Sequence, residues 1–237
     1  MIEVRGVSKV YGKKQNTFTA LDDVSFEIKE GSTVAIIGKS GSGKSTLMHV
    51  MSGLDHPTTG GVIIDGKELH ALKSKAMDAF RADQMSFIFQ AFFVEPNQSV
   101  YQNVMLPLEI AKVPRRRRKG MVMDALKAVE LADKVGNKAV NLSGGQKQRL
   151  AIARSIVNKP GLIFADEPTG NLDSTTGDLI TKLLFDLNKQ IKCTLIIVTH
   201  DEELAQKCQV QIRLKDGKIE SINTKKPNSP KKKVGKG

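Results

Sequence analysis

Residues 38–46 read Gly38-Lys-Ser-Gly-Ser-Gly-Lys-Ser-Thr46, and this short run decides the fold around it. Its glycines let successive backbone N–H groups converge on a polyphosphate, where Lys44 adds a positive charge and the Ser45 hydroxyl can ligate Mg²⁺. Residues 34–37 predict a buried strand before the run, and residues 44–52 predict a helix whose N-terminus faces the phosphates. We call residues 38–46 the phosphate loop; its expected phosphate contacts are Gly38, Ser40, Gly41, Ser42, Gly43, Lys44, Ser45 and Thr46.

A second motif follows in the run Leu162-Ile-Phe-Ala-Asp166-Glu167. Its four apolar residues predict a fully buried parallel strand with Asp166 at the C-terminal end. There Asp166 can hold Mg²⁺ through water, and Glu167 is placed to polarise an attacking water molecule. Taken alone, two acids after an apolar run also fit a plain strand that ends in a polar turn. The phosphate loop upstream favours the catalytic interpretation.

The run Leu142-Ser-Gly-Gly-Gln146, which opens a helical pattern at residues 146–157, narrows the class of protein further. With it, the chain resembles the ATPase subunit of an ATP-binding cassette transporter over roughly residues 1–222. Other elements match in the family's order: Tyr11 in the aromatic-loop position, Gln90, residues 171–173 (Asn-Leu-Asp) and His200. The resemblance implies an α/β fold of the P-loop NTPase type. It would have a parallel-sheet core, an antiparallel β subdomain and an α-helical subdomain at about residues 91–150.

The resemblance also implies how nucleotide is bound, with two copies of the chain facing each other head to tail. Each ATP then lies between the phosphate loop of one copy and the other copy's Ser143, Gly144, Gly145 and Gln146, with Asp173 also assigned to the nucleotide site. Physically, the small-residue helix start at residues 143–145 is a second anion site. Two sites so far apart in sequence share one nucleotide only if the chain dimerises or folds back, and dimerisation is the simpler arrangement.

Catalytic roles follow from the same resemblance. It implies ATP hydrolysis by Glu167, Lys44, Gln90 and His200, with Mg²⁺ held by Ser45, Gln90 and Asp166. His200 follows a predicted buried strand and so should lie at the sheet edge where ligands bind in open α/β folds. Tyr11 can stack on adenine or simply pack at the end of an N-terminal strand, and Phe18 is the nearest alternative for stacking.

Three further segments, residues 54–60, 101–108 and 167–173, are similar to one branch of cassette ATPases. That branch serves lipoprotein-releasing, macrolide-exporting, antimicrobial-peptide and cell-division systems. We therefore expect a subunit that powers an exporter-type membrane permease; the alternative is regulation of a cell-wall hydrolase through a permease-like partner without transport. Cassette ATPases that act on DNA or ribosomes usually carry a second cassette or long insertions, which this sequence lacks. Residues 92–96, Phe-Phe-Val-Glu-Pro, depart from the branch's usual Phe-Asn-Leu-Leu-Pro and leave the partner's identity open.

The net charge of +12 is concentrated in two segments. Residues 112–119 hold six bases and residues 225–237 hold six lysines, with no acid in either. The remaining bases equal the 25 acids in number, so the body of the chain is neutral and we expect no nucleic-acid partner. Residues 223–237 are predicted to be a basic disordered tail. The tail and the run from Arg115 to Lys119 are either a solvated surface or a contact with anionic lipid beside a membrane partner.

The rest of the sequence adds expectations about location and secondary structure. It has no run of 18 apolar residues and opens on no signal peptide, so we expect a protein on the cytoplasmic face of the cell membrane, held there by its partner. Cys193 and Cys208 lack metal or redox spacing and should be reduced thiols. Further strands are predicted at residues 2–7, 18–28, 85–89, 194–199, 210–214 and 218–222, and helices at residues 100–111 and 117–131.

Overall fold

The structure is a computed structural model that describes residues 1–13 and 16–225. Its centre is a six-stranded sheet in the order β10-β9-β3-β8-β7-β6, in which only the β10–β9 pair is antiparallel. The strands are β3 (Thr33–Ile37), β6 (Met85–Phe89), β7 (Leu162–Asp166), β8 (Thr194–Thr199), β9 (Val210–Lys215) and β10 (Lys218–Thr224). All six were predicted from the sequence. Because β3, β7 and β8 run parallel, the phosphate loop, Asp166 and His200 come to one edge of the sheet.

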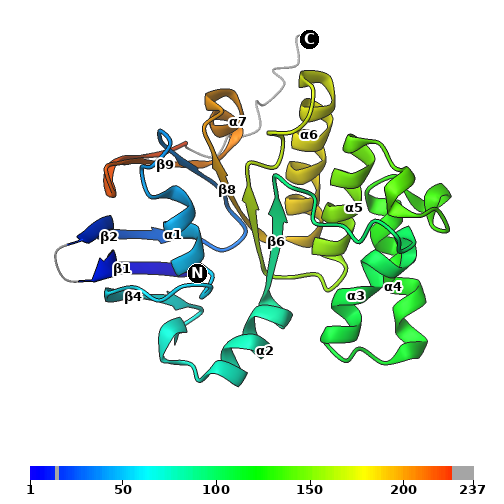
Figure 1. Cartoon of the computed structure of the whole chain (residues 1–237), viewed down its shortest axis with the longest axis horizontal. Coiled ribbons are helices and arrows are strands. Elements are labelled where there is room, and N and C mark those ends of the chain that lie inside the picture. The colour runs from blue at the N-terminus through cyan, green and yellow to red at the C-terminus, as the bar shows by residue number, and fades with distance from the viewer. Residues whose placement is uncertain (14–15, 226–237) are drawn as a thin grey trace, which may run out of the picture.

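A second, antiparallel sheet has the order β2-β1-β4-β5 and lies beside β9 and α1 in Figure 1. Its strands are β1 (Ile2–Lys13), β2 (Asn16–Ile28), β4 (Thr59–Ile64) and β5 (Lys67–Glu68). The prediction of β1 and β2 is confirmed, although β1 continues past the expected end at residue 7. We did not predict β4, whose pattern is interrupted by Gly60 and Gly61. Gly60 is needed because its φ is +77° and a Cβ there would lie 2.2 Å from the Gly6 carbonyl oxygen.

Seven α-helices are described, and three of them form a group at one side of the central sheet (Figure 1). That group is the helical subdomain: α3 (Val100–Ile110), α4 (Arg115–Ala128) and α5 (Gly144–Ile156). Helix α4 begins two residues earlier than predicted, because Pro114 is its N-cap, and it ends three residues earlier than predicted. The other helices are α1 (Lys44–Met51), α2 (Ser74–Gln84), α6 (Ser174–Ile191) and α7 (Glu202–Lys207).

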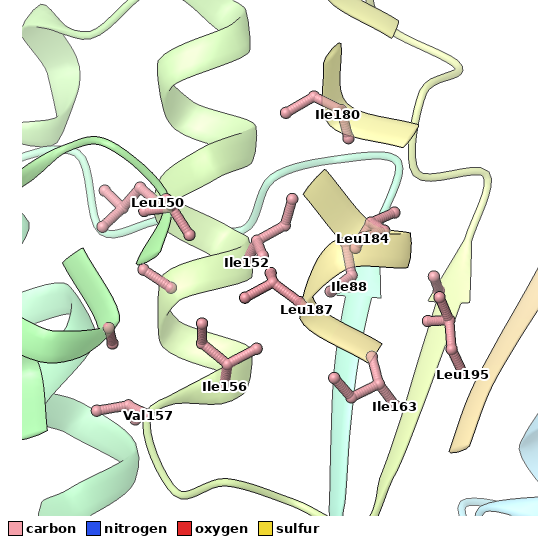
Figure 2. Packing of buried hydrophobic residues seen from close by; sticks show 14 of the residues in the cluster. Ile88, Leu150, Ile152, Ile156, Val157, Ile163, Ile180, Leu184, Leu187 and Leu195 are labelled. Atoms are coloured by element: carbon pink, nitrogen blue, oxygen red, sulfur yellow. The ribbon is translucent and has the colours of Figure 1, made fainter. Parts of the chain in front are cut away.

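The central sheet is buried on both faces, as expected of parallel strands. Along β3, Val34 and Ile36 belong to one hydrophobic cluster, while Ala35 and Ile37 belong to another on the opposite face. Figure 2 shows how α5 joins the second cluster: Ile152 and Ile156 point toward α6 and toward Ile88 and Ile163 of the sheet. Each such side chain contributes about 1.5–3 kcal/mol when buried. Helix α5 is therefore fixed firmly against the core.

The C-terminal boundary differs from the prediction. Residues 223–237 were expected to form the tail, but β10 continues to Thr224. The Lys225 backbone N–H then donates to the Gln209 carbonyl oxygen at 2.8 Å. The strand ladder thus carries residues 223–225, which the sequence alone assigned to the tail because they are polar. The remaining part of that prediction, residues 226–237, lies outside the described residues.

Candidate nucleotide site

The phosphate loop joins β3 to α1 and requires glycine at defined positions. Gly41 and Gly43 have φ values of +80° and +97°, in the left-handed region. A Cβ at Gly43 would lie 2.4 Å from the Ala20 carbonyl oxygen, and one at Gly38 would lie 2.4 Å from the Leu214 carbonyl oxygen. Gly43 also caps α1 without a side-chain hydrogen bond. The first backbone N–H groups of α1 are therefore available to an anion.

The side chains of the loop have distinct surroundings. The Lys44 ammonium donates to the carbonyl oxygens of Gly38 at 2.8 Å and Lys39 at 3.0 Å, so it reaches back across the loop. Ser40 and Ser45 are exposed, and Thr46 is half-buried. The buried Ser42 hydroxyl has no hydrogen-bond partner among the described residues. An unpaired buried hydroxyl beside free backbone N–H groups fits a loop built to receive phosphate oxygens.

Asp166 and Glu167 follow one another at the C-terminal end of β7 but have different environments. Burial, with a further contribution from the Glu167 charge, raises the pKa of Asp166, although Lys44 and His49 oppose the rise. Lys44 and His49 both belong to α1, so Asp166 lies near the phosphate loop and this helix. Asp166 therefore sits where a carboxylate is stabilised by additional positive charge.

The Glu167 carboxylate is held by the end of β8. It accepts from the Thr199 hydroxyl at 3.1 Å and from the His200 backbone N–H at 3.0 Å, and it lies 2.7 Å from His200 Nδ1. The Glu167 backbone has a φ of +46°, which is strained for a residue with a side chain. The structure thus brings together Glu167, which the sequence assigned to the attacking water, and His200, which it assigned to ATP hydrolysis.

Gln90 lies at the end of β6, and its side chain contacts the loop after β7. Its amide nitrogen donates to Asn171 Oδ1 at 3.2 Å, and its backbone carbonyl accepts from Asn171 Nδ2 at 2.9 Å. A Cβ at Gly170 would come 2.8 Å from the Gln90 amide. Gln90 therefore contacts residues 170–171, and no hydrogen bond to its side-chain oxygen is found within residues 1–13 and 16–225.

The second glycine-rich segment begins α5 and is separate from the phosphate loop of the same chain: α1 and α5 stand apart in Figure 1, with β8 and β6 between them. Ser143 caps α5, and Gln146 completes a reciprocal capping box. A Cβ at Gly145 would lie 2.6 Å from Thr176 on α6. Asp173 caps α6 by accepting from the Thr176 N–H at 3.0 Å, which lowers the Asp173 pKa. The start of α5 at residues 143–146 therefore lies against the start of α6, which follows residues 171–173.

Tyr11 lies on β1 directly opposite Phe18 on β2, and both rings are exposed, by 39% and 60% respectively. The Tyr11 hydroxyl donates to Asp55 at 2.7 Å, and the Lys9 ammonium lies 4.8 Å from its ring centroid. Burial and the Asp55 contact raise the pKa of Tyr11, while Thr46 of the phosphate loop acts in the opposite direction. Tyr11 is thus anchored beside the phosphate loop, and adenine stacking stays a prediction for either ring.

Sequence reasoning missed two residues that shape this site. Thr199 was expected only as part of a strand, yet its hydroxyl contacts Glu167. Gln148 on α5 is fully buried, and its amide donates to the Pro168 carbonyl oxygen at 2.6 Å. A signal for Gln148 was present, because residues 148, 151, 152 and 155 form one buried helical stripe. The pairing of Thr199 with Glu167 depends on β7 and β8 being neighbours, which a linear pattern does not reveal.

The donor set suits a hard cation. Ser45, Gln90 and Asp166 offer a hydroxyl, an amide oxygen and a carboxylate, the oxygen ligands that Mg²⁺ prefers. Within residues 1–13 and 16–225 no cluster of three or more His, Cys, Asp or Glu side chains could hold a metal by itself. Cys193 and Cys208 are buried free thiols, and burial raises their pKa values to about 11 and about 12.

The edge of the central sheet holds what is needed to bind a triphosphate and activate water, so this is an ATPase of the P-loop class. A family profile described as ABC transporter matches residues 21–170. The chain belongs to the ABC transporter family, as an ATP-hydrolysing cassette subunit. None of the helices in the described part of the chain combines the length and apolarity needed to cross a bilayer.

Relatives and a solved structure place the chain in one branch of that family. It is 40% identical over 219 residues to the lipoprotein-releasing system ATP-binding protein LolD of Syntrophus aciditrophicus, covering 92% of this chain and 98% of that one. It is 43% identical over 221 residues to the macrolide export ATP-binding/permease protein MacB of Bdellovibrio bacteriovorus, covering 93% of this chain and 34% of MacB. A dimeric, post-hydrolysis structure of the cassette MJ0796, bound to ADP and Pi, is 38% identical with a TM-score of 0.85, covering 94% of this chain and 98% of that one.

Proposed function

We propose that this chain dimerises on ATP and drives an exporter-type membrane permease of the lipoprotein, macrolide or antimicrobial-peptide kind. Two relatives support the partner: LolD is named for lipoprotein release, and MacB carries ATP-binding and permease functions in one protein. The permease would hold the subunit on the cytoplasmic face of the membrane. The observation that carries the dimer is the separation, within one chain, of two glycine-rich helix starts that both suit phosphate.

In the proposed site, the work of each residue follows from its geometry. Glu167, held by Thr199 and His200, orients and polarises the attacking water. Lys44 and the N–H groups of the phosphate loop stabilise charge on the transferring phosphoryl group, together with Ser143 and Gly145 of the second copy. Mg²⁺ held by Ser45, Gln90 and Asp166 would supply further charge neutralisation between the phosphates.

A groove between the sheet and the helical subdomain is the proposed permease contact. It has a volume of about 440 Å³ and is lined by mainly apolar side chains, among them Phe87, Phe89, Leu106 and Ile110. Ile110 is 63% exposed, and the neighbouring Phe93 is 65% exposed with a φ of +46°. Of the apolar residues 92–94, Val94 packs against the core and Phe93 is the exposed one.

The basic run beside this groove supports a lipid contact as a further part of the proposal. Arg115, Arg116, Arg117 and Lys119 are exposed, whereas Arg118 turns inward and donates to Val113 O at 2.8 Å and Glu109 at 3.0 Å. Helix α4 begins at this run, has no acid in its first turn and has no side-chain cap. The helix dipole therefore adds to the positive charge and favours an anionic headgroup.

The dimer is tested by replacing Ser143 with arginine. We expect Ser143→Arg to leave ATP binding by the isolated subunit almost unchanged but to abolish dimerisation and turnover, because Ser143 serves the other copy's ATP. In the wild type, turnover per subunit should rise with protein concentration. Ser99→Arg is the matched control, since Ser99 caps α3 with the same capping box and lies in neither glycine-rich segment. Equal loss of ATP binding and dimerisation in Ser143→Arg would contradict a site shared by two copies.

A further inference from the structure

Gln148 is a polar residue at a position where packing alone favours an apolar one. Its side chain is fully buried on α5, on the stripe that also holds Ala151 and Ile152. Its Nε2 donates to the Pro168 carbonyl oxygen, but no group in the described ranges donates to its Oε1. An unpaired buried acceptor destabilises the folded state. A residue retained at that cost is expected at a functional or strained position.

The strain lies one residue before the contact. Glu167 has a φ of +46°, and the ring of Pro168 disfavours the ordinary right-handed helical region for it. A side-chain-bearing residue keeps such a backbone only where its surroundings fix it. The Glu167 N–H donates to Val198 O at 2.9 Å, and its carbonyl accepts from the Gly170 N–H at 3.0 Å. Gln148 fixes the next peptide, because Pro168 is buried and has no N–H of its own.

We infer that Gln148 is a positioning residue for Glu167: its hydrogen bond to Pro168 holds the strained backbone that aims the Glu167 carboxylate at Thr199 and His200. The inference rests on the proposed role of Glu167 in hydrolysis. It also ties Glu167 to α5, the helix that begins at Ser143 and that the proposed dimer places against the partner's ATP. A movement of α5 would then change the position of the Glu167 carboxylate in the same chain.

A double-mutant cycle separates this role from simple packing. Gln148→Met keeps the length and volume of the side chain but removes the donor. We expect its kcat to fall about 10-fold to 100-fold while KM changes less than about twofold, because misplacing a catalytic group by about 1 Å has effects of that size. In the Glu167→Gln background, Gln148→Met should cause no further fall in the residual single-turnover rate, because the group it positions is already lost.

Asn188→Leu is the matched control. Asn188 is another buried amide, which donates to the carbonyl oxygens of Gly31, at 3.1 Å, and Cys193, at the opposite edge of the sheet. It should lower thermal stability with little change in kcat. If Gln148→Met does not fold, Gln148→Asn withdraws the amide by one methylene and serves in the same cycle.

Three results would overturn the inference: near-wild-type kcat in Gln148→Met, an equal loss of kcat in Asn188→Leu, or the same proportional fall from Gln148→Met with and without Glu167. Near-wild-type turnover by Glu167→Gln itself would instead refute the proposed role of Glu167. The two failures are therefore distinguishable.

Discussion

At the scale of single residues, the site holds two neighbouring carboxylates in different environments. Burial disfavours the charged form of Asp166, whereas hydrogen bonds fix the position of Glu167. Burial and the neighbouring Glu167 raise the pKa of Asp166. Its folded-state pKa lies above the unfolded one, so folding is favoured most when Asp166 is protonated. That contribution is lost as the pH rises through the raised pKa. At a pH above the raised pKa the nucleotide-free protein therefore carries the Asp166 charge at a loss of stability.

Asp166→Asn should consequently stabilise the nucleotide-free protein at pH 7 while abolishing turnover with ATP and Mg²⁺. We expect a higher free energy of unfolding because the amide removes a charge that burial disfavours, and the gain is limited because Asp166 is only half-buried. Thermal unfolding without nucleotide measures it, and the difference should vanish at a pH below the pKa of Asp166 in the unfolded chain. A variant less stable than wild type at pH 7 would show that Lys44 and His49 outweigh burial.

At the scale of elements, the turn after β6 links the apolar groove to α5. The Arg154 guanidinium on α5 donates to the carbonyl oxygens of Phe93 at 2.6 Å and Phe92 at 3.3 Å. Desolvation lowers the pKa of Arg154, so this cation is held largely away from water. The Phe93 ring meets Phe89 edge-on, with centroids 5.3 Å apart. A partner seated on Phe93 would thus press directly on the element that carries Ser143 and Gln148.

Phe93→Ser should lower the ratio of permease-stimulated to basal turnover at least several-fold, with a melting temperature close to wild type because the ring is already exposed. Co-purification with the membrane partner, followed by ATPase assays, measures the ratio. Val94→Ser is the comparison: Val94 packs against the core, so its loss should lower stability. Unchanged stimulation in Phe93→Ser would move the docking surface to another part of the helical subdomain.

At the scale of the whole molecule, the excess positive charge lies in residues 112–119 and 225–237, which include none of the residues assigned to the nucleotide site. Arg116→Gln with Arg117→Gln should weaken pelleting with anionic vesicles by about tenfold or more, since each base near such a surface contributes about 1 kcal/mol. Neutral vesicles should show no difference, and high salt should remove it. Lys73→Gln with Lys75→Gln neutralises the same charge on α2 as a control, and deletion of residues 226–237 tests the tail. If the wild type does not prefer anionic vesicles, the run is a solvated surface.

The sequence allowed the central sheet and the phosphate loop to be predicted because their signals are local. Apolar runs marked β7 and β8, and the glycines marked the loop before α1. By contrast, α6 was not predicted, because its start at residues 174–177 is rich in serine, threonine and glycine. Asp173 was assigned to the nucleotide, so its equally plain signal as a helix cap was passed over. Helix α2 has one buried residue, Met77, and so gave no periodic pattern.

For the candidate site, the sequence identified individual residues but not the contacts between them. The sequence pointed to Glu167, His200 and Gln90 individually, but their contacts depend on which strands are neighbours. Glu167 meets His200 because β7 lies beside β8, and Gln90 meets Asn171 because β6 lies beside β7. The link from Gln148 to Pro168 crosses between the helical subdomain and the sheet. Non-local pairings of this kind become visible only in three dimensions.

We propose that two copies of this chain close around ATP and that Glu167 then activates water. Size-exclusion chromatography with light scattering on Glu167→Gln, with and without ATP, tests it most directly. The amide keeps the phosphate loop intact but cannot polarise water, so the variant should bind ATP, hardly hydrolyse it and accumulate as a stable dimer only when ATP is present. A variant that stays monomeric at saturating ATP, or that retains near-wild-type hydrolysis, would contradict the account.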